Sequence, residues 1–452
     1  MTALTVRAGE RGRELTVRYS RRHALAFAAG AAATAATAAT VSGARRALAS
    51  APHGGPSLAP TLDITTPATA GLDPAALDAA FAFIGARVAA GTVPGAVALV
   101  ARNGHIAAWR AYGQIDRRGG AMRPDAIFDL ESISKVVATA PAVMLLAERS
   151  VLDLDAPVAR YLPAFAARGK AAITIRDMLR YSAGLDVDVT FQDTSTPRAS
   201  ASQVVRAWAL MLRQVPVAPP RSQVLYSDLT YRTLGHLIET VTGERLDRFV
   251  RRSLWAPLGL NSTSYFPTVP AAPLLERVAG TRYSALRRRV LRGEMADEQD
   301  WWLGGIVGCD SVFSDAYDLA VFNQMMLNGG AYGGVRLLRP ETVAAMTRDQ
   351  TPRVAPQRRD YLDGLLLTPK GYGWELSVDP RKSPGGAGFG RVAFGKSGGA
   401  GTFMWLDPRR QLMAIYLTNY GEPQPFTGAG WDKLVADIAP FHFFDLVASA
   451  TA

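Results

Sequence analysis

The sequence predicts an α+β protein in which one antiparallel sheet is interrupted by a mainly helical insertion. Strand patterns occur near both ends of the chain, at residues 95–112 and 392–418, whereas residues 150–305 are mainly helical and rich in loops. Helical patterns also precede the first strands and follow the last ones. Because strands that are distant in sequence can pair in one sheet, this order favours a sheet flanked by N- and C-terminal helices.

The first helix and hairpin have clear local signals. Asp73 and Pro74 supply an N-cap and a first-turn proline, apolar residues follow at helical spacing, and Gly91 ends the helix. Residues 95–100 and 105–112 are apolar strand patterns joined around Asn103-Gly104, a dipeptide that favours a tight hairpin turn. We therefore expect a helix followed by an antiparallel pair.

Later elements follow from the same rules. One apolar helix is expected from Ser132 to about Arg149, with a kink at Pro141. Another helix carries apolar residues at 234, 237, 238 and 241 and is closed by Gly243. The C-terminal strands and helix are expected at Val392–Phe394, Thr402–Leu406, Leu412–Thr418 and Trp431–Ala439.

This pattern predicts one large domain behind a leader. We expect a signal segment at 1–49, a Pro/Ser/Thr/Gly-rich linker at 50–70 and a tail at 441–452. The domain would span 71–440, with its sheet part at about 71–130 and 306–440 and its helical part at about 131–305.

The leader resembles a twin-arginine export signal. Arg21-Arg22 precede an Ala/Thr-rich stretch, and Ala47-Leu48-Ala49 fits a signal-peptidase site. We therefore expect a periplasmic or secreted protein. No stretch approaches the ~20 apolar residues of a stable membrane span.

Composition and charge indicate a globular protein with an ordinary surface. Of the 452 residues, 48% are hydrophobic and 20% are charged. Residues 1–49 hold eight arginines and two glutamates, a net +6 of the formal +11, so the remainder carries +5. Without a basic stripe interleaved with aromatics, nucleic-acid binding is not expected.

With one cysteine and five histidines, the chain is not expected to have a metal site or a histidine-based triad. Cys309 is the single cysteine, so it cannot pair within the chain and is expected to be a small buried residue. Only His105 and His236 lie within the predicted domain, and neither has a partner at metal-ligand spacing. Proton transfer in a serine enzyme would then fall to lysine and tyrosine.

The segment Ser132-Ile133-Ser134-Lys135 carries the main chemical signal. Residues i and i+3 of a helix share one face, so the Ser132 hydroxyl and the Lys135 amine can meet. A serine hydroxyl needs a neighbouring base, and a desolvated lysine can be one. This arrangement is the S-x-x-K signature of active-site serine acyl transferases.

Two further segments could complete such a site. Tyr226 precedes a helix and could relay a proton if a nearby cation lowered its pKa, although taken by itself a core aromatic is the favoured interpretation. Lys396 lies between glycines on a predicted strand and could supply fixed positive charge.

The same strand matches two other motifs out of context. Gly390–Ser397 fits the phosphate-binding pattern G-x-x-x-x-G-K-S, but no helix is predicted after it. Gly395–Gly399 fits G-x-S-x-G, but the strand-to-helix turn of a nucleophile elbow is missing. Ser397 is therefore not predicted to be the nucleophile.

Taken in order, Ser132-x-x-Lys135, Tyr226-x-Asp228 and Lys396-Ser397-Gly398 resemble the serine β-lactamase and penicillin-binding-protein superfamily. The likeness is greatest to class C β-lactamase-like hydrolases, which include esterases and D,D-carboxypeptidase-like members. Segments such as Val93–Val97 and Phe313–Leu319 match too, and the likeness spans about residues 72–420. It implies a β-lactamase/transpeptidase-like fold.

The resemblance also implies roles for individual residues. Ser132 would be the nucleophile, Lys135 its activating partner and Tyr226 the second proton-transfer group. Lys396 would hold the charge of the tyrosine or a substrate carboxylate. The substrate-binding and oxyanion positions would be Asp228, Ser397, Gly398 and Gly399, with the backbone N–H groups of Ser132 and Gly399 forming the oxyanion hole. No metal or cofactor is implied, and the oligomeric state stays open.

Two departures from the family pattern concern the substrate. Asp228 stands where the family usually has asparagine, and an ionised carboxylate can only accept hydrogen bonds. Lys396-Ser397-Gly398 replaces the His-Thr-Gly that is common among non-lactamase relatives. We expect an acyl-enzyme hydrolase of esters or amides, with D-alanyl cell-wall peptides and β-lactams among the candidates. The alternatives are an inactive relative that binds cell-wall peptides and a nucleotide-binding protein that uses Gly390–Ser397.

Overall fold

The structure is a computed structural model. It describes residues 2–8, 13–19, 61–116, 119–196, 198–265, 272–351, 369–377, 385–421 and 428–451. Two strands, β1 (Thr2–Ala8) and β2 (Arg13–Tyr19), pair antiparallel at the N-terminus. The predicted twin-arginine motif, the cleavage site and most of the linker fall in residues 20–60, outside the described residues.

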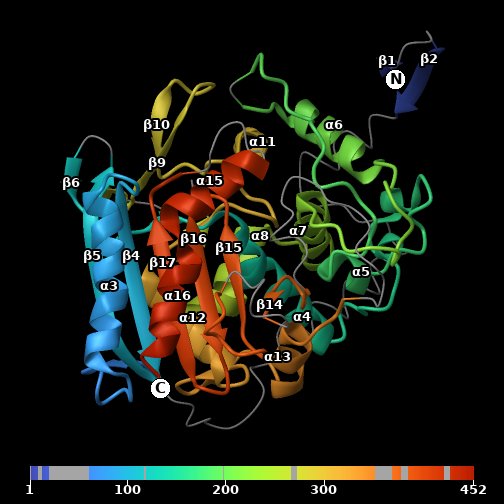
Figure 1. Cartoon of the computed structure of the whole chain (residues 1–452). Helices are drawn as coiled ribbons and strands as arrows, with labels where there is room; N and C mark the ends of the chain where they lie inside the picture. The colour runs from blue at the N-terminus through green and yellow to red at the C-terminus, as the bar shows by residue number, and fades with distance from the viewer. Residues whose placement is uncertain are drawn as a thin grey trace.

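One eight-stranded sheet combines strands from both ends of the chain. Its order along the main path is β14-β15-β16-β17-β4-β5-β3, and β6 pairs with β5. Figure 1 shows β4 and β5, in blue, beside the red C-terminal strands. The strands are β3 (Asp63–Ile64), β4 (Gly95–Arg102), β5 (His105–Asp116), β6 (Gly119–Ala121), β14 (Glu375–Leu376), β15 (Phe394–Gly398), β16 (Thr402–Asp407) and β17 (Leu412–Thr418). All pairs are antiparallel except β3 with β5, which confirms the predicted sheet.

The β4–β5 hairpin forms because its turn has the residues that such a turn needs. Asn103 and Gly104 have φ values of 54° and 82°, the positive values of a type I′ turn. Arg102 pairs with His105 across the turn, and Leu412 of β17 pairs with Arg102 on the other side. The hairpin therefore joins the N- and C-terminal halves of the sheet.

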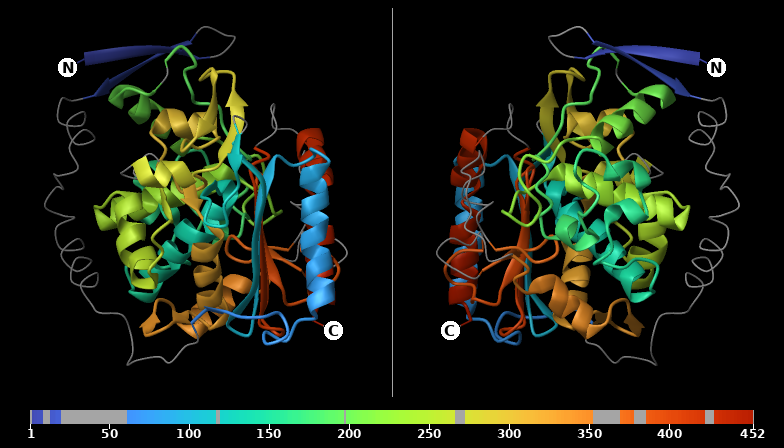
Figure 2. Two further views of the ribbon diagram at one scale, coloured as in Figure 1. Left: turned by 90° about the vertical axis from the view of Figure 1, so that its left-hand side faces the viewer. Right: turned by 90° about the vertical axis from the view of Figure 1, so that its right-hand side faces the viewer.

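Helices from the two ends of the chain cover one face of the sheet. These are α3 (Pro74–Ala89), α15 (Gly428–Ile438) and α16 (Pro440–Ser449), and α3 and α16 run together in Figure 2. The prediction of a tail after residue 440 is wrong, because Pro440 begins a new helix instead. Phe443 and Phe444 of α16 are fully buried, and the Ala450 carbonyl accepts a hydrogen bond from Asp73 N. A second helix was missed because Pro440 was interpreted only as the end of the first.

The other face carries the helical part of the domain (Figure 2). Its longer helices are α4 (Ala140–Glu148), α6 (Ala201–Leu212), α7 (Asp228–Thr242), α12 (Ala316–Leu327) and α13 (Pro340–Thr347). Short helices complete it: η3 (Val158–Arg160), η4 (Pro163–Ala166), α5 (Ile175–Leu179), α8 (Leu246–Val250), η5 (Arg251–Trp255), α9 (Ala256–Leu258), α10 (Ala272–Arg277) and α11 (Glu298–Leu303).

Small strand pairs interrupt this helical part, and they were not predicted. The strands β9 (Gly280–Ser284) and β10 (Arg289–Arg292) form a hairpin, while β8 (Ser264–Tyr265), β11 (Val312–Ser314) and β7 (Phe128–Asp129) form a short sheet. The strands β12 (Ala331–Tyr332) and β13 (Val335–Arg336) also pair. Strands this short lack a periodic pattern long enough to recognise in sequence.

The segment after Ser132 is not one continuous α-helix. It begins as a 3₁₀ turn, η1 (Glu131–Ile133), passes through a π-helical turn, η2 (Lys135–Thr139), and continues as α4. Pro141 has no N–H to donate to the carbonyl of Val137, four residues earlier. The indole Nε1 of Trp255 donates to that oxygen instead, at 2.9 Å. The expected kink at Pro141 is thus a change of helix type directly after the motif.

Among the helices that the structure describes, none combines the length and apolar character that crossing a membrane requires.

Candidate active site

Ser132 lies at the start of the helical segment, and Lys135 is one turn away. The Nζ atom of Lys135 donates to the Ser132 Oγ atom at 2.8 Å, the contact that the i, i+3 spacing predicts. Glu131, just before Ser132, has a φ of 47°. Such a conformation is uncommon outside glycine, and it occurs here in the turn that presents the serine.

Tyr226 approaches the same oxygen from the loop before α7. Its phenol oxygen lies 2.6 Å from Ser132 Oγ, and its ring stacks on Tyr181 with centroids 5.0 Å apart. The next residue, Ser227, is the N-cap of α7 and accepts a hydrogen bond from Thr230 N. The cap fixes where the helix begins, and so places Tyr226 and Asp228 on either side of it.

Lys135 is surrounded by oxygen atoms from two other segments, the start of α7 and residues 309–310. Its Nζ atom is 2.6 Å from Asp228 Oδ1, 3.6 Å from Asp310 Oδ1 and 3.0 Å from the carbonyl of Cys309. Burial alone would lower the pKa of Lys135, but the attraction of Asp228 and Asp310 outweighs it and holds the pKa well above its ordinary value. The lysine is therefore an ammonium, not the neutral base that desolvation alone would produce.

The pKa of Tyr226 also differs from the expectation that a nearby cation would lower it. The Lys135 Nζ atom lies 5.1 Å from the centroid of its ring. Burial nevertheless raises the pKa of Tyr226 well above its ordinary value, and Lys135 opposes that rise without reversing it. The phenol therefore keeps its proton in the free site.

Lys396 lies on β15 at the other side of Tyr226. Its Nζ atom is 5.0 Å from the centroid of the tyrosine ring, and it pairs with the buried carboxylate of Glu375 on β14. The Ser397 hydroxyl lies 3.1 Å from both oxygens of Glu375. Burial lowers the pKa of Lys396 below its ordinary value, although Glu375 opposes that fall.

Gly398, directly after Ser397, stands where the strand passes close to the turn that carries Ser132. A Cβ atom on Gly398 would lie 2.2 Å from the Leu130 carbonyl oxygen and 2.4 Å from Thr402 Oγ1. Only glycine permits this approach of β15 to the turn that carries Ser132. The oxyanion role of the Ser132 and Gly399 N–H groups stays a prediction.

The strand β15 excludes both the phosphate-binding loop and the nucleophile elbow whose sequence patterns it matches. Ser397 continues β15 and does not begin a helix, so neither the phosphate-binding loop nor the nucleophile elbow has its required context. The carboxylate of Glu375 holds the Lys396 ammonium that a nucleotide phosphate would need.

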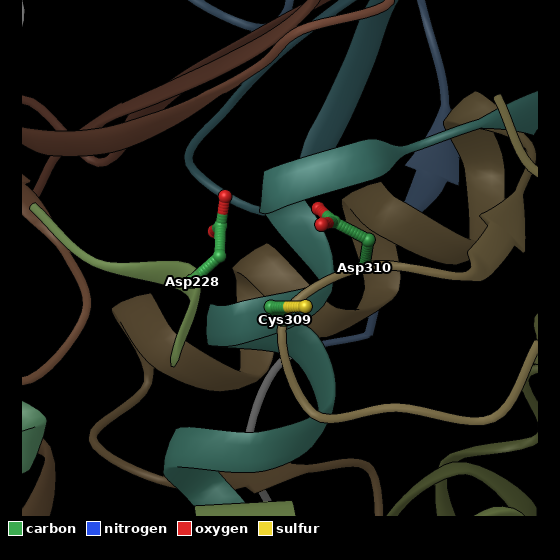
Figure 3. A group of neighbouring side chains, drawn as sticks. All are labelled: Asp228, Cys309 and Asp310. Carbon is green, nitrogen blue, oxygen red and sulfur yellow. The ribbon is translucent and has the colours of Figure 1, made fainter. Parts of the chain in front are cut away.

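Asp228, Cys309 and Asp310 form a compact group beside Ser132. Their potential ligand atoms lie within 4.8 Å of one another, and Figure 3 shows the two carboxylates extending toward the same side of the site. The Lys135 ammonium already contacts both carboxylates. The thiol of Cys309 lies 3.0 Å from Asp300 Oδ2, and burial raises the pKa of the thiol well above its ordinary value. These residues therefore suit a lysine better than a metal ion.

Asp310 and Glu375 were missed by the sequence analysis. Each is a buried acid that contacts a residue of the predicted motifs, but neither has a fixed spacing from its partner in the chain. The one available signal was an isolated acid in a mainly apolar stretch, as at residues 304–313.

Comparison with known proteins identifies the family. The family model described as Beta-lactamase matches residues 81–437, most of the chain. The chain belongs to the beta-lactamase family. Relatives of this beta-lactamase-family protein include a Salmonella gallinarum protein named as a D-alanyl-D-alanine carboxypeptidase, 30% identical over 390 residues. The alignment covers 80% of this chain and 86% of that protein. The corresponding Salmonella typhimurium protein is 29% identical with the same coverage.

Solved structures of other proteins share the fold of this chain. EstCE1, titled a hydrolase with promiscuous acyltransferase activity, has a TM-score of 0.61 and 22% identity, with 80% of this chain and 98% of that chain covered. A class C beta lactamase from Rhodobacter sphaeroides has a TM-score of 0.58 and 21% identity, with 80% and 99% covered. These likenesses confirm the predicted β-lactamase/transpeptidase-like α+β fold.

Proposed function

We propose that the protein is an exported serine hydrolase that forms an acyl-enzyme at Ser132 and hydrolyses an ester or amide. The observation that carries this proposal is the convergence of Lys135 and Tyr226 on the Ser132 oxygen, at 2.8 and 2.6 Å. A hydroxyl held by two donors is oriented for attack, and the negative charge that develops on it is stabilised where it forms.

The proposed roles follow from position. Ser132 is the nucleophile, Lys135 activates it through its charge, and Tyr226 is the second proton-transfer group. Lys396 stabilises charge on Tyr226 or meets a substrate carboxylate, and the N–H groups of Ser132 and Gly399 bind the oxyanion. Asp228, Ser397 and Gly398 line the substrate site.

The names of the relatives suggest the candidate substrates. The Salmonella relatives are named as D-alanyl-D-alanine carboxypeptidases, and a structural neighbour is a family VIII carboxylesterase with a TM-score of 0.58 and 23% identity over 81% of this chain and 96% of that one. We propose that D-alanyl peptides, β-lactams and simple esters are the classes to test. Export rests on Arg21-Arg22 and the Ala/Thr-rich stretch after them.

Two labels separate this proposal from its alternatives. A fluorescent fluorophosphonate reacts with an activated serine, and labelled penicillin reports a penicillin-binding site. Labelling by the first alone would indicate an esterase, and labelling by both would indicate a penicillin-binding enzyme. Labelling by neither, with retention of cell-wall peptide, would contradict the proposal and favour an inactive binding protein.

A further inference from the structure

The hydrogen bonds around Ser132 define where its own proton points. A serine hydroxyl donates one hydrogen bond and accepts two. Lys135 and Tyr226 are both donors to Ser132 Oγ, so the two acceptor positions are filled. The Ser132 hydroxyl donates to Asp310 Oδ1, which lies 3.4 Å away. Its proton is therefore directed at a carboxylate, whereas the lysine and the tyrosine direct their own protons at it.

The protonation states agree with this direction. An ammonium has no lone pair, and the pKa of Lys135 is held well above its ordinary value by Asp228 and Asp310 against the effect of burial. Burial also raises the pKa of Tyr226, so the phenol is protonated as well. Of the groups in contact with Ser132 Oγ, the carboxylate of Asp310 is thus the one able to accept a proton.

We infer that Asp310 is a catalytic residue that takes the proton of Ser132 when this oxygen attacks the substrate. The inference rests on the proposed function, since it assigns the base of that same reaction. The side chain of Asp310 is 6% exposed, so the transfer takes place largely out of water.

Proton transfer accompanies the attack of Ser132 on the substrate. The O–H bond of Ser132 breaks and its proton moves to Asp310, while Ser132 Oγ bonds to the substrate carbonyl carbon. The carbonyl π pair moves onto oxygen and gives the oxyanion. On collapse, the bond to the leaving oxygen or nitrogen breaks and the leaving atom takes the proton of the Tyr226 phenol. Tyr226 recovers a proton from the Lys135 ammonium, and Lys135 recovers one from Asp310. Water then repeats the sequence as the attacking group and releases the acid.

Several charged groups surround Asp310 and set its response to pH. Burial raises the pKa of Asp310 above its ordinary value, Lys135 opposes the rise and Asp228 adds to it. The titratable and charged groups that interact with it are Asp129, Lys135, Tyr226, Asp228, Arg232, Asp297, Asp300 and Cys309. A carboxyl with a raised pKa is the base only above that pKa. Acylation should therefore fall as the pH drops through it, above the usual range of aspartate.

Asp310→Asn is the direct test, and Asp297→Asn is the matched control. Both variants remove one negative charge from the same neighbourhood, but only Asp310 contacts Ser132. Asparagine can also keep the N-cap hydrogen bond that Asp297 makes in α11. With p-nitrophenyl acetate, we expect the acylation rate of Asp310→Asn to fall by about 10²–10⁴-fold, the range of general-base catalysis. The acylation rate of Asp297→Asn should fall by less than about tenfold, and its pH profile should keep the acid limb of the wild type.

Chemical rescue distinguishes a base from a structural support. In Asp310→Ala, added formate should restore part of the acylation rate, with a dependence on formate concentration, because it supplies a carboxylate in the space left by the side chain. A purely structural aspartate would not be rescued in this way.

Two different failures would have different meanings. If Asp310→Asn acylated at the wild-type rate with an unchanged acid limb, or if formate gave no rescue in a folded Asp310→Ala protein, Asp310 would not be the base. If wild-type protein took up no fluorophosphonate at all, the proposed function would fail, and this inference with it.

Discussion

Two regions of the site bury lysines to the same extent but shift the pKa values of these lysines in opposite directions. In the first, Lys135 lies between Asp228 and Asp310 at the start of the helical part. In the second, at the edge of the sheet, Lys396 and Lys370 share Glu375 as the carboxylate that raises their pKa values most. The three lysines are at most 1% exposed. Burial is therefore equal, and the ratio of carboxylates to lysines differs.

That ratio decides the charge of each lysine. Two carboxylates hold the pKa of Lys135 above its ordinary value despite burial. Around Glu375, burial dominates: it lowers the pKa of Lys396, and it lowers the pKa of Lys370 to about 7. The comparison indicates that the helical side of the site supplies a fixed cation, whereas the sheet side has a cation that depends on pH.

Lys135→Met should have the largest effect, because it removes the ammonium that contacts both Asp228 and Asp310. Breaking a buried ion pair by removing one partner costs about 3–5 kcal/mol of folding stability. We also expect fluorophosphonate labelling of Ser132 to be lost. Urea unfolding and labelling of the same sample measure both effects. Unchanged stability would mean that the carboxylates do not depend on the lysine.

Lys370→Met should make the fold more stable at low pH. In the folded state Lys370 loses its proton above about pH 7, whereas an unfolded lysine keeps it to about pH 10.4. Between these values the unfolded state binds more protons, so raising the pH stabilises the wild type. The stabilising effect of the variant should be about 2–3 kcal/mol greater at pH 6 than at pH 9.

Urea unfolding at the two pH values gives this difference. Lys433→Met is the matched control, because the Lys433 side chain is 69% exposed and should show little of the effect. Equal stabilisation at both pH values would mean that Lys370 stays charged over this range, as Lys135 does. The proposed difference between the two regions would then be wrong.

Glu375→Gln should remove the carboxylate that raises the pKa of Lys396 most, ahead of Asp228. The pKa of Lys396, already lowered by burial, should fall further. An ammonium is present below its pKa and lost above it, so the loss of activity at alkaline pH should move to lower pH, by about 1–3 units. Profiles of kcat/KM against pH measure the shift. Ser397→Ala removes only a neutral partner of Glu375 and should not move that limb.

Asp228→Asn should have the smallest effect and would make the first region resemble the second. Lys135 would keep Asp310 as its one carboxylate, and the amide oxygen of asparagine can still accept its hydrogen bond. Replacing a charged acceptor with a neutral one should cost about 1 kcal/mol of stability. The pKa of Lys135 should fall, and so should that of Lys396, which Asp228 also raises, so activity should be lost at lower pH than in the wild type. An alkaline limb that did not move would show that Asp228 does not help to hold these lysines in their charged form.

The parts of the fold predicted from sequence are those with local signals. Asn103-Gly104 specified the β4–β5 turn, the run Leu412–Thr418 coincides with β17, and Gly243 ends α7 in the left-handed conformation that it was expected to adopt. The helix α16 was missed because its docking onto α3 depends on tertiary packing.

The site shows the same division. The spacing of Ser132 and Lys135 on one face of a helix predicted their contact. The protonation states could not be predicted in this way, because they depend on Asp310, which is 178 residues from Ser132 in the chain. Lys396 could be placed on its strand, but its pairing with Glu375 of the neighbouring strand had no motif to reveal it.

Ser132 should be the only nucleophile of the site, and mass spectrometry of the modified peptide tests this directly. Trypsin should release Ser132 and Ser134 on one peptide that ends at Lys135. Ser134 is a control within that peptide, because it is buried and its hydroxyl accepts a hydrogen bond from Val312 N. After brief reaction with a fluorophosphonate, fragmentation should locate the adduct on Ser132 in the wild type and Ser134→Ala, and find none in Ser132→Ala. An adduct on Ser134, or one that persists in Ser132→Ala, would contradict the account.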